Sequence, residues 1–185
     1  NLYQIEDIQT AIKNNPNSVL MVGFNRRFAP HILKMKTLLD ARKQPKSFIF
    51  TINAGVIPAD HWVQDSKVGG GRIIGEVCHF IDLMCFLSGS PINEWSVQSM
   101  GNDTLKDKVT INLIFKDGSL GSIHYLANGS KRFPKERVEV FCGGSIIQLD
   151  NFRKMKGYGW AGFNKMNLWR QDKGHKLEIQ TFLDS

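Results

Sequence analysis

The 185-residue chain is 42% hydrophobic and 22% charged, and its formal net charge is +7. This composition excludes collagen, coiled coils and wholesale disorder, and the length allows a sizeable core without disulfide or metal staples. The most apolar stretch, residues 73–87, is shorter than the ~20 residues of a membrane span. It also carries Glu76, His79 and Asp82, so we expect no membrane partner.

The first part of the chain alternates between helix and strand signals. Residues 5–12 place apolar side chains at helical spacing, and the polar turn 14–17 ends that helix. The short apolar run 18–24 predicts a buried strand. Pro30 is typical of a helix start and opens a second helix with one apolar side. Residues 47–54 predict another strand, after which a loop follows.

A long apolar helix over residues 72–88, closed by Gly89, separates this part from a series of strands. A closing helix begins at His175. The strands are predicted over residues 94–100, 109–115, 120–127, 137–141 and 145–149. Asp117-Gly118 and Gly143-Gly144 lie between paired runs and predict two hairpins.

The sequence therefore predicts an α+β fold. We expect a mostly antiparallel open sheet with helices on one face, preceded by a short αβ piece. Helices on one face leave the other face of the sheet to be covered by water or by a partner subunit. We expect a homo-oligomer through this open face.

The apolar helix carries one polar stripe. At about 100° per residue, Arg72, Gly75, Glu76, His79 and Asp82 fall within an arc of about 120°. Buried ionisable groups cost several kcal/mol unless they are paired, so the stripe needs a reason. One explanation is a self-satisfied network in which His79 bonds to Glu76 or Asp82. The other is proton transfer, because histidine titrates near neutral pH and a neighbouring carboxylate orients its ring.

The stripe also resembles a known motif. Residues 69–82, GGGRIIGEVCHFID, resemble the active-site helix of the Gfo/Idh/MocA oxidoreductases, the glucose–fructose oxidoreductase and inositol dehydrogenase family. The family pattern is a glycine-rich turn followed by Asp-x-Gly-x-His-x-x-Asp. The triple glycine, His79 and Asp82 match this pattern. The first Asp of the family falls on Gly75 and its Gly on Val77, so Glu76 is a candidate replacement for the missing Asp.

Three further segments extend the resemblance over most of the chain. Residues 22–30 (VGFNRRFAP) look like the strand that leaves the nucleotide-binding domain, and residues 59–71 like the loop before the active-site helix. Residues 169–175 (WRQDKGH), followed by Glu178, look like the closing segment. The resemblance implies that residues 1–30 end a dinucleotide-binding Rossmann domain and that residues 31–185 form a substrate-binding and oligomerisation domain.

By the same resemblance, the whole protein is an oxidoreductase that uses NAD or NADP and acts on a hydroxyl or keto group of a sugar, nucleotide sugar or cyclitol. His79 would be the catalytic acid/base. The implied substrate-binding residues are Arg72, Glu76, Asp82 and Trp62, and the residues implied to lie near the cofactor are Asn25, Arg26 and Arg27. The sequence decides neither the substrate nor the choice between NAD and NADP.

Two motifs of the family are absent from this chain. It has neither the Gly-x-Gly-x-x-Gly fingerprint nor a Glu-Lys-Pro motif, so there is no pyrophosphate cradle. We therefore expect no cofactor bound to this chain alone, and no turnover. The alternative is a non-catalytic oligomerisation or scaffold domain. Gly75 in place of the family Asp favours that alternative slightly, whereas the retained His79 favours the enzyme.

The remaining sequence features predict no further functional site. Cys78 and Cys85 lie about 10 Å apart along a helix, too far for a disulfide, so we expect free thiols in a reducing cytoplasm. Scattered histidines and unpaired cysteines predict no metal site, and His31 and His124 read as ordinary surface or strand residues. The basic clusters lack a recognisable nucleic-acid module. Solvated surface, or attraction to an anionic sugar or nucleotide, is the reading we favour for them.

Overall fold

The computed structural model describes residues 2–58, 60–65, 68–101 and 107–185. Within them, one sheet has the strands β1 (Ser47–Asn53), β2 (Ile92–Ser99), β3 (Val109–Phe115), β4 (Leu120–Leu126), β5 (Glu136–Cys142), β6 (Ser145–Asp150), β7 (Lys154–Tyr158) and β8 (Lys165–Asn167). The strand order is β2-β3-β4-β1-β5-β6-β7-β8. Strand β1 pairs in parallel with β4 and antiparallel with β5, and every other pairing is antiparallel.

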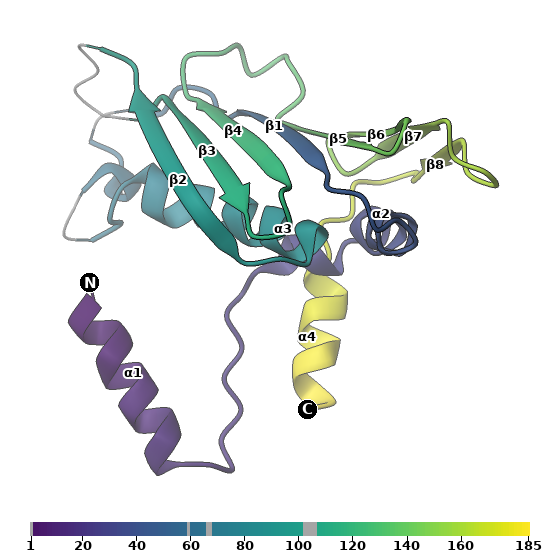
Figure 1. Ribbon diagram of the computed structural model, residues 1–185. Helices are drawn as coiled ribbons and strands as arrows, with labels where there is room; N and C mark the ends of the chain where they lie inside the picture. The colour runs from purple at the N-terminus through teal and green to yellow at the C-terminus, as the bar shows by residue number, and fades with distance from the viewer. Residues whose placement is uncertain (1, 59, 66–67, 102–106) are drawn as a thin grey trace.

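Helices α2 (Pro30–Asp40) and α3 (Cys78–Ser88) lie against one face of this sheet, and α1 (Leu2–Asn14) stands away from it (Figure 1). Helix α4 spans His175–Leu183, and the short turns are η1 (Asn25–Phe28), η2 (Trp62–Gln64) and η3 (Ile73–Val77). The inward side chains of the central strands pack on α2 and α3 in one core that includes Phe48, Phe50, Leu83, Met84 and Ile123. The α+β prediction is confirmed.

Both predicted hairpins are present, and glycine explains their turns. Gly118 connects β3 to β4 with φ of 83°, and Gly143 and Gly144 connect β5 to β6 with φ of 53° and 78°. Positive φ is costly for a residue with a Cβ atom, so these positions favour glycine. Two residues at positive φ, Asn151 and Phe152, make the next turn into β7. The sequence analysis missed β7 and β8, because five- and three-residue strands with a single buried side chain, Met155, lack an alternating pattern.

The predicted strand over residues 18–24 is wrong. These residues form an extended connection without a strand partner in the described part of the chain (Figure 1). A strand exists only through its neighbours, and no neighbouring strand reaches this run. The helix before it, α1, forms as predicted, but its apolar side is open to solvent, since Ile5 and Ile8 are 53% and 49% exposed.

The predicted helix over residues 72–88 begins with a turn of different geometry. Residues Ile73–Val77 form one π-helical turn, and the α-helix starts only at Cys78. Gly89, with φ of 72°, ends it as predicted. The predicted polar arc relied on α-helical spacing along the whole helix. The wider π turn rotates its first residues out of that arc. Arg72 is therefore 3% exposed, while Gly75 lies on the surface. Single π turns are frequent at functional sites.

His31 is a second correction, because it is fully buried in α2 rather than a surface residue. Its Nε2 lies 3.1 Å from the Met166 carbonyl oxygen and anchors β8. His124 lies in β4 as expected, with Nδ1 3.1 Å from Thr110 Oγ1. Cys142 is a buried core residue, and Cys78 and Cys85 are free thiols.

Candidate active site around His79

The polar residues singled out in the sequence gather around the turn η1 and the helix α3. Turn η1 ends the connection that comes from α1, and α3 lies beneath the centre of the sheet (Figure 1). The first residue of β5 and the segment that leads into α4 complete the cluster, because Glu136 pairs with Arg26 of η1 and Lys173 pairs with Glu136. Four segments that are distant in sequence therefore meet at one end of α3.

His79 is half-buried, and its ring packs edge-on against Phe24 with centroids 5.6 Å apart. Its Nδ1 atom is buried without a hydrogen-bond partner. Among the described residues, no side chain or backbone group hydrogen-bonds either ring nitrogen. Burial lowers the pKa of His79, and the positive charge of Arg26 lowers it further, while Asp82, Glu136 and Glu76 act against both. The imidazole is therefore neutral at physiological pH.

The self-satisfied network that the sequence left open is not what forms. Asp82 pairs with Arg27 instead: Arg27 Nε donates to Oδ2 at 3.0 Å, and Nη2 donates to Oδ1. Arg27 also lies over the Phe86 ring, with its guanidinium carbon 5.3 Å from the centroid. A cavity of about 380 Å³ opens beside this pair, lined by Phe24, Arg27, Phe28 and Asp82 together with residues 20–22.

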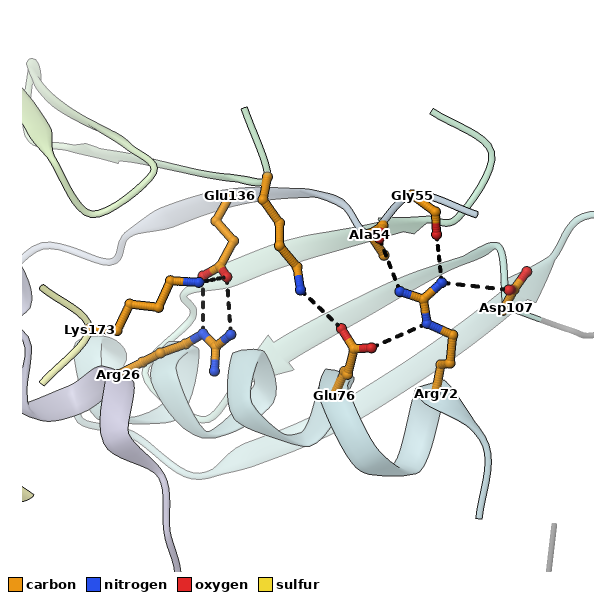
Figure 2. A network of polar contacts seen from close by, with 9 residues as sticks. Arg26, Ala54, Gly55, Arg72, Glu76, Asp107, Glu136 and Lys173 are labelled. Carbon is orange, nitrogen blue, oxygen red and sulfur yellow. Dashed lines mark hydrogen bonds and ion pairs between the residues drawn. The ribbon is translucent and has the colours of Figure 1, made fainter. Parts of the chain in front are cut away.

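Glu76 and Arg72 form a second pair at the start of the helix (Figure 2). Arg72 donates to Glu76 Oε1 at 3.2 Å and to the carbonyl oxygens of Gly55 at 2.7 Å and Ala54 at 3.1 Å. Asp107 lies 3.8 Å away. The guanidinium group is thus fully engaged within the protein, and it fastens the end of β1 to the π turn.

Lys135 approaches the other oxygen of Glu76 at 3.5 Å. Burial alone would raise the pKa of Glu76, but the charges of Lys135 and Arg72 outweigh it and hold that pKa below its usual value. Glu76 is therefore ionised and still 31% exposed. Of the carboxylates near His79 it is the one that reaches furthest into solvent.

A third carboxylate, Glu136, was not recognised in the sequence. Arg26 donates Nε and Nη2 to its two oxygens at 3.1 Å each, and Lys173 donates Nζ to Oε1 at 2.6 Å (Figure 2). Burial would raise the pKa of Glu136, but Arg26 and Lys173 lower it, so the carboxylate is ionised although its side chain is 1% exposed. Glu136 begins an ordinary strand, so nothing in the local sequence marks it.

Two further candidates from the sequence differ sharply in exposure. Asn25 is 4% exposed and donates Nδ2 to the Lys173 carbonyl oxygen at 2.8 Å, so its side chain holds the turn η1. Trp62 in η2 is 62% exposed and stacks on His61, with centroids 5.9 Å apart. Its indole ring is free to contact a ligand.

The described residues hold neither a candidate metal site nor a membrane-spanning helix. In that part of the chain, no set of three His, Cys, Asp or Glu side chains has the arrangement of a metal site. No helix described there is both long and apolar enough to cross a bilayer.

The model of the GFO/IDH/MocA C-terminal domain matches residues 34–147, more than half of the chain. The chain belongs to this family. The match includes η3, α3 and the start of β5, and therefore His79, Glu76, Asp82 and Glu136.

Individual relatives agree with this assignment. An uncharacterised oxidoreductase of Bacillus subtilis, YrbE, is 24% identical over 90% of the chain and 49% of its own length. Myo-inositol 2-dehydrogenase of Thermotoga maritima is 27% identical over 74% of the chain and 42% of its own length. The super-repressor mutant of Gal80p from Saccharomyces cerevisiae shares the fold, with a TM-score of 0.81 at 13% identity over 98% of the chain and 54% of its own. The chain thus spans about half the length of the curated relatives that it matches.

Proposed function

We propose that this chain is the substrate-side domain of an NAD(P)-dependent oxidoreductase that acts on a hydroxyl or keto group of a sugar, nucleotide sugar or cyclitol. His79 is its acid/base. One observation carries the proposal: His79 has no hydrogen-bond partner among the described residues, whereas Asp82, Glu76 and Glu136 are each held by cations. Because the neighbouring carboxylates are already paired, the unpaired imidazole is available for a ligand.

The residues of this chain do not by themselves fit a dinucleotide. The glycine-rich turn that cradles the pyrophosphate is not in the sequence. A nicotinamide cofactor would supply the hydride chemistry. This chain contributes a proton carrier next to the turn η1, and we propose that η1 lies at the junction with the nucleotide-binding domain.

The proton moves at Nε2 of His79, because Nδ1 is buried. In the direction of alcohol oxidation, the neutral imidazole accepts the hydroxyl proton of the substrate, and in the reverse direction the imidazolium returns it to the carbonyl oxygen. The lowered pKa of His79 favours the neutral base. In this proposal, ionised Glu76 contacts substrate hydroxyls and exposed Trp62 contacts the apolar face of a sugar ring.

The other candidates take supporting roles in this proposal. Arg72 holds Glu76 and the end of β1, so it positions a substrate contact instead of making one. Asp82 holds Arg27, and Asn25 and Arg26 are likewise bonded within the protein. Asn25, Arg26 and Arg27 would therefore shape the cofactor junction by stabilising the turn η1.

Replacing His79 tests the proposal in the whole protein. We expect His79→Gln to lower turnover with the best sugar or cyclitol substrate by ~10²- to 10⁴-fold, the usual contribution of general acid–base catalysis. His175→Gln, at the exposed start of α4, is the matched control and should retain full turnover. Equal turnover in both variants would remove His79 from the mechanism. A wild-type protein inert toward every sugar and cyclitol would favour a non-catalytic role, such as the repressor role named for Gal80p.

We further propose that a second copy of the chain covers the open face of the sheet. Cross-strand neighbours on that face form one row, Ile114–Leu120–Ser47–Phe141–Ile146–Tyr158. Leu120 and Phe141 flank β1 on its two sides and are 52% and 38% exposed. A two-fold axis along β1 would place Leu120 of one copy on Phe141 of the other. Such self-complementarity is what an isologous dimer requires.

A further inference from the structure

Two cationic side chains from separate segments meet at one buried carboxylate of a third segment. Arg26 comes from η1, Lys173 from the segment before α4, and Glu136 from the first position of β5 (Figure 2). The exposed fractions of the Arg26 and Lys173 side chains are 12% and 18%. Breaking a buried pair by removing one partner leaves an uncompensated charge. Arg26 therefore depends on Glu136 for its position.

The backbone around Glu136 is held on both sides, so this carboxylate is a fixed point. The Asn53 N–H donates to the Lys135 carbonyl oxygen at 2.8 Å, and the Asn151 N–H donates to the Glu136 carbonyl oxygen at 2.7 Å. Lys135, the preceding residue, reaches Glu76. Two consecutive residues, Lys135 just before β5 and Glu136 at its start, thus contact the π turn η3 and the turn η1.

Arg26 connects this fixed point to His79. Its guanidinium carbon lies 4.5 Å from the centroid of Phe80, the next residue after His79. Phe24, two residues before Arg26, packs directly on the imidazole. The charged groups that act on His79 are Arg26 from η1, Asp82 from α3, Glu136 from β5 and Glu76 from η3. Arg26 is the one cation among these four, and Glu136 is the carboxylate that binds it.

We propose that Glu136 is a positioning residue of the active site, which holds Arg26 on Phe80 and balances its charge beside His79. This inference rests on the proposed role of His79, and Glu136 acts on the imidazole through Arg26. Without the carboxylate, Arg26 and Lys173 would be two unpaired cations at the site. The arginine, without its counter-charge, would then raise the positive potential at His79.

The test is the titration of the His79 imidazole followed by NMR in this chain, with the signal identified by its loss in His79→Gln. We expect Glu136→Gln to lower the apparent pKa of His79 by about 0.5–1 unit, because Arg26 loses its counter-charge. Arg26→Gln should raise that pKa by a similar amount, and the double variant should titrate close to the wild type. Glu139→Gln is the matched control, since Glu139 lies on the opposite face of β5 and bonds to Gln148.

Opposite shifts in the two single variants support the proposal, because a residue that only stabilises the fold would not move one imidazole in both directions. An unmoved His79, or shifts of the same sign, would overturn it. If Glu136→Gln unfolds, the pKa of His79 in Arg26→Gln and in the double variant still tests the proposal. Neither of these variants leaves both Arg26 and Lys173 unpaired. The titration does not depend on turnover. An inactive protein with opposite shifts would refute the proposed function alone, and an active one without them would refute this inference alone.

Discussion

Arg27 and Asp82 form a two-pronged ion pair that joins the turn η1 to the helix α3. Asp82 lies one helical turn after His79, and its carboxylate is bound by Arg27 instead of by the imidazole. Parallel N–H···O bonds of this kind fix geometry as well as charge. His79 consequently keeps a ring nitrogen without a partner. At the same time, the ion pair holds the turn η1 against α3, the helix that carries His79.

This clamp predicts a loss of stability in Asp82→Asn. The Asp82 side chain is 9% exposed and that of Arg27 is 37% exposed, so solvent screens part of the interaction. We expect the free energy of unfolding in urea to fall by about 1–2 kcal/mol. Asp40→Asn breaks the surface pair between Lys36 and Asp40 and should cost less than about 0.5 kcal/mol. Equal losses in the two variants would contradict the clamp.

His31 predicts that stability depends on pH. Burial lowers the pKa of this histidine, although the Met166 carbonyl and Asp172 act in the opposite direction. With Nε2–H donated to Met166, protonation would place a second N–H donor on Nδ1, which is buried without a partner. Because the folded-state pKa lies below the unfolded value of about 6.5, the stabilisation is complete above pH 6.5. It is lost as the pH falls from there toward the folded-state pKa.

Urea unfolding of the wild type and His31→Gln at pH 7.5 and pH 5.5 measures this effect. We expect the wild type to lose more stability than the variant between the two pH values. His175→Gln changes an exposed histidine and should keep the wild-type difference. A His31→Gln protein with an undiminished pH dependence would show that the burial of His31 is not its source.

We predict that the 185-residue chain by itself binds NADH and NADPH only weakly. Because the chain lacks the glycine-rich turn, calorimetry of the 185-residue chain with NADH or NADPH should detect no micromolar binding. A dissociation constant in that range would mean that η1 and the residues near it hold a dinucleotide without the usual cradle, and the division of labour proposed above would fail.

The apolar row on the open sheet face predicts a dimer that a charge disrupts. Phe141→Lys places an ammonium group in the centre of the row and should shift the chain to monomers in sedimentation equilibrium. Val97→Lys is the control, because Val97 is also exposed but pairs with Ile111 on the other face of the sheet. A wild-type chain that is already monomeric at high concentration, or a Phe141→Lys dimer, would refute the interface.

Local patterns determined the elements with strong internal signals. The alternation in β3 through β6 and the Asp-Gly and Gly-Gly turns fixed both hairpins, because backbone preferences there are set by neighbouring residues. The spacing of His79 and Asp82 after three glycines was enough to indicate the family, which residues 34–147 establish.

Only the tertiary structure decided which partner each charge takes. Arg26 with Glu136 and Arg27 with Asp82 are separated by 110 and 55 residues, and periodicity along the chain carries no information over such distances. The π turn before Cys78 likewise escaped an analysis that assumes regular spacing. The sequence shows that burying a polar residue costs desolvation free energy. How much of this cost is offset depends on the partner that the fold brings within about 3 Å of the residue.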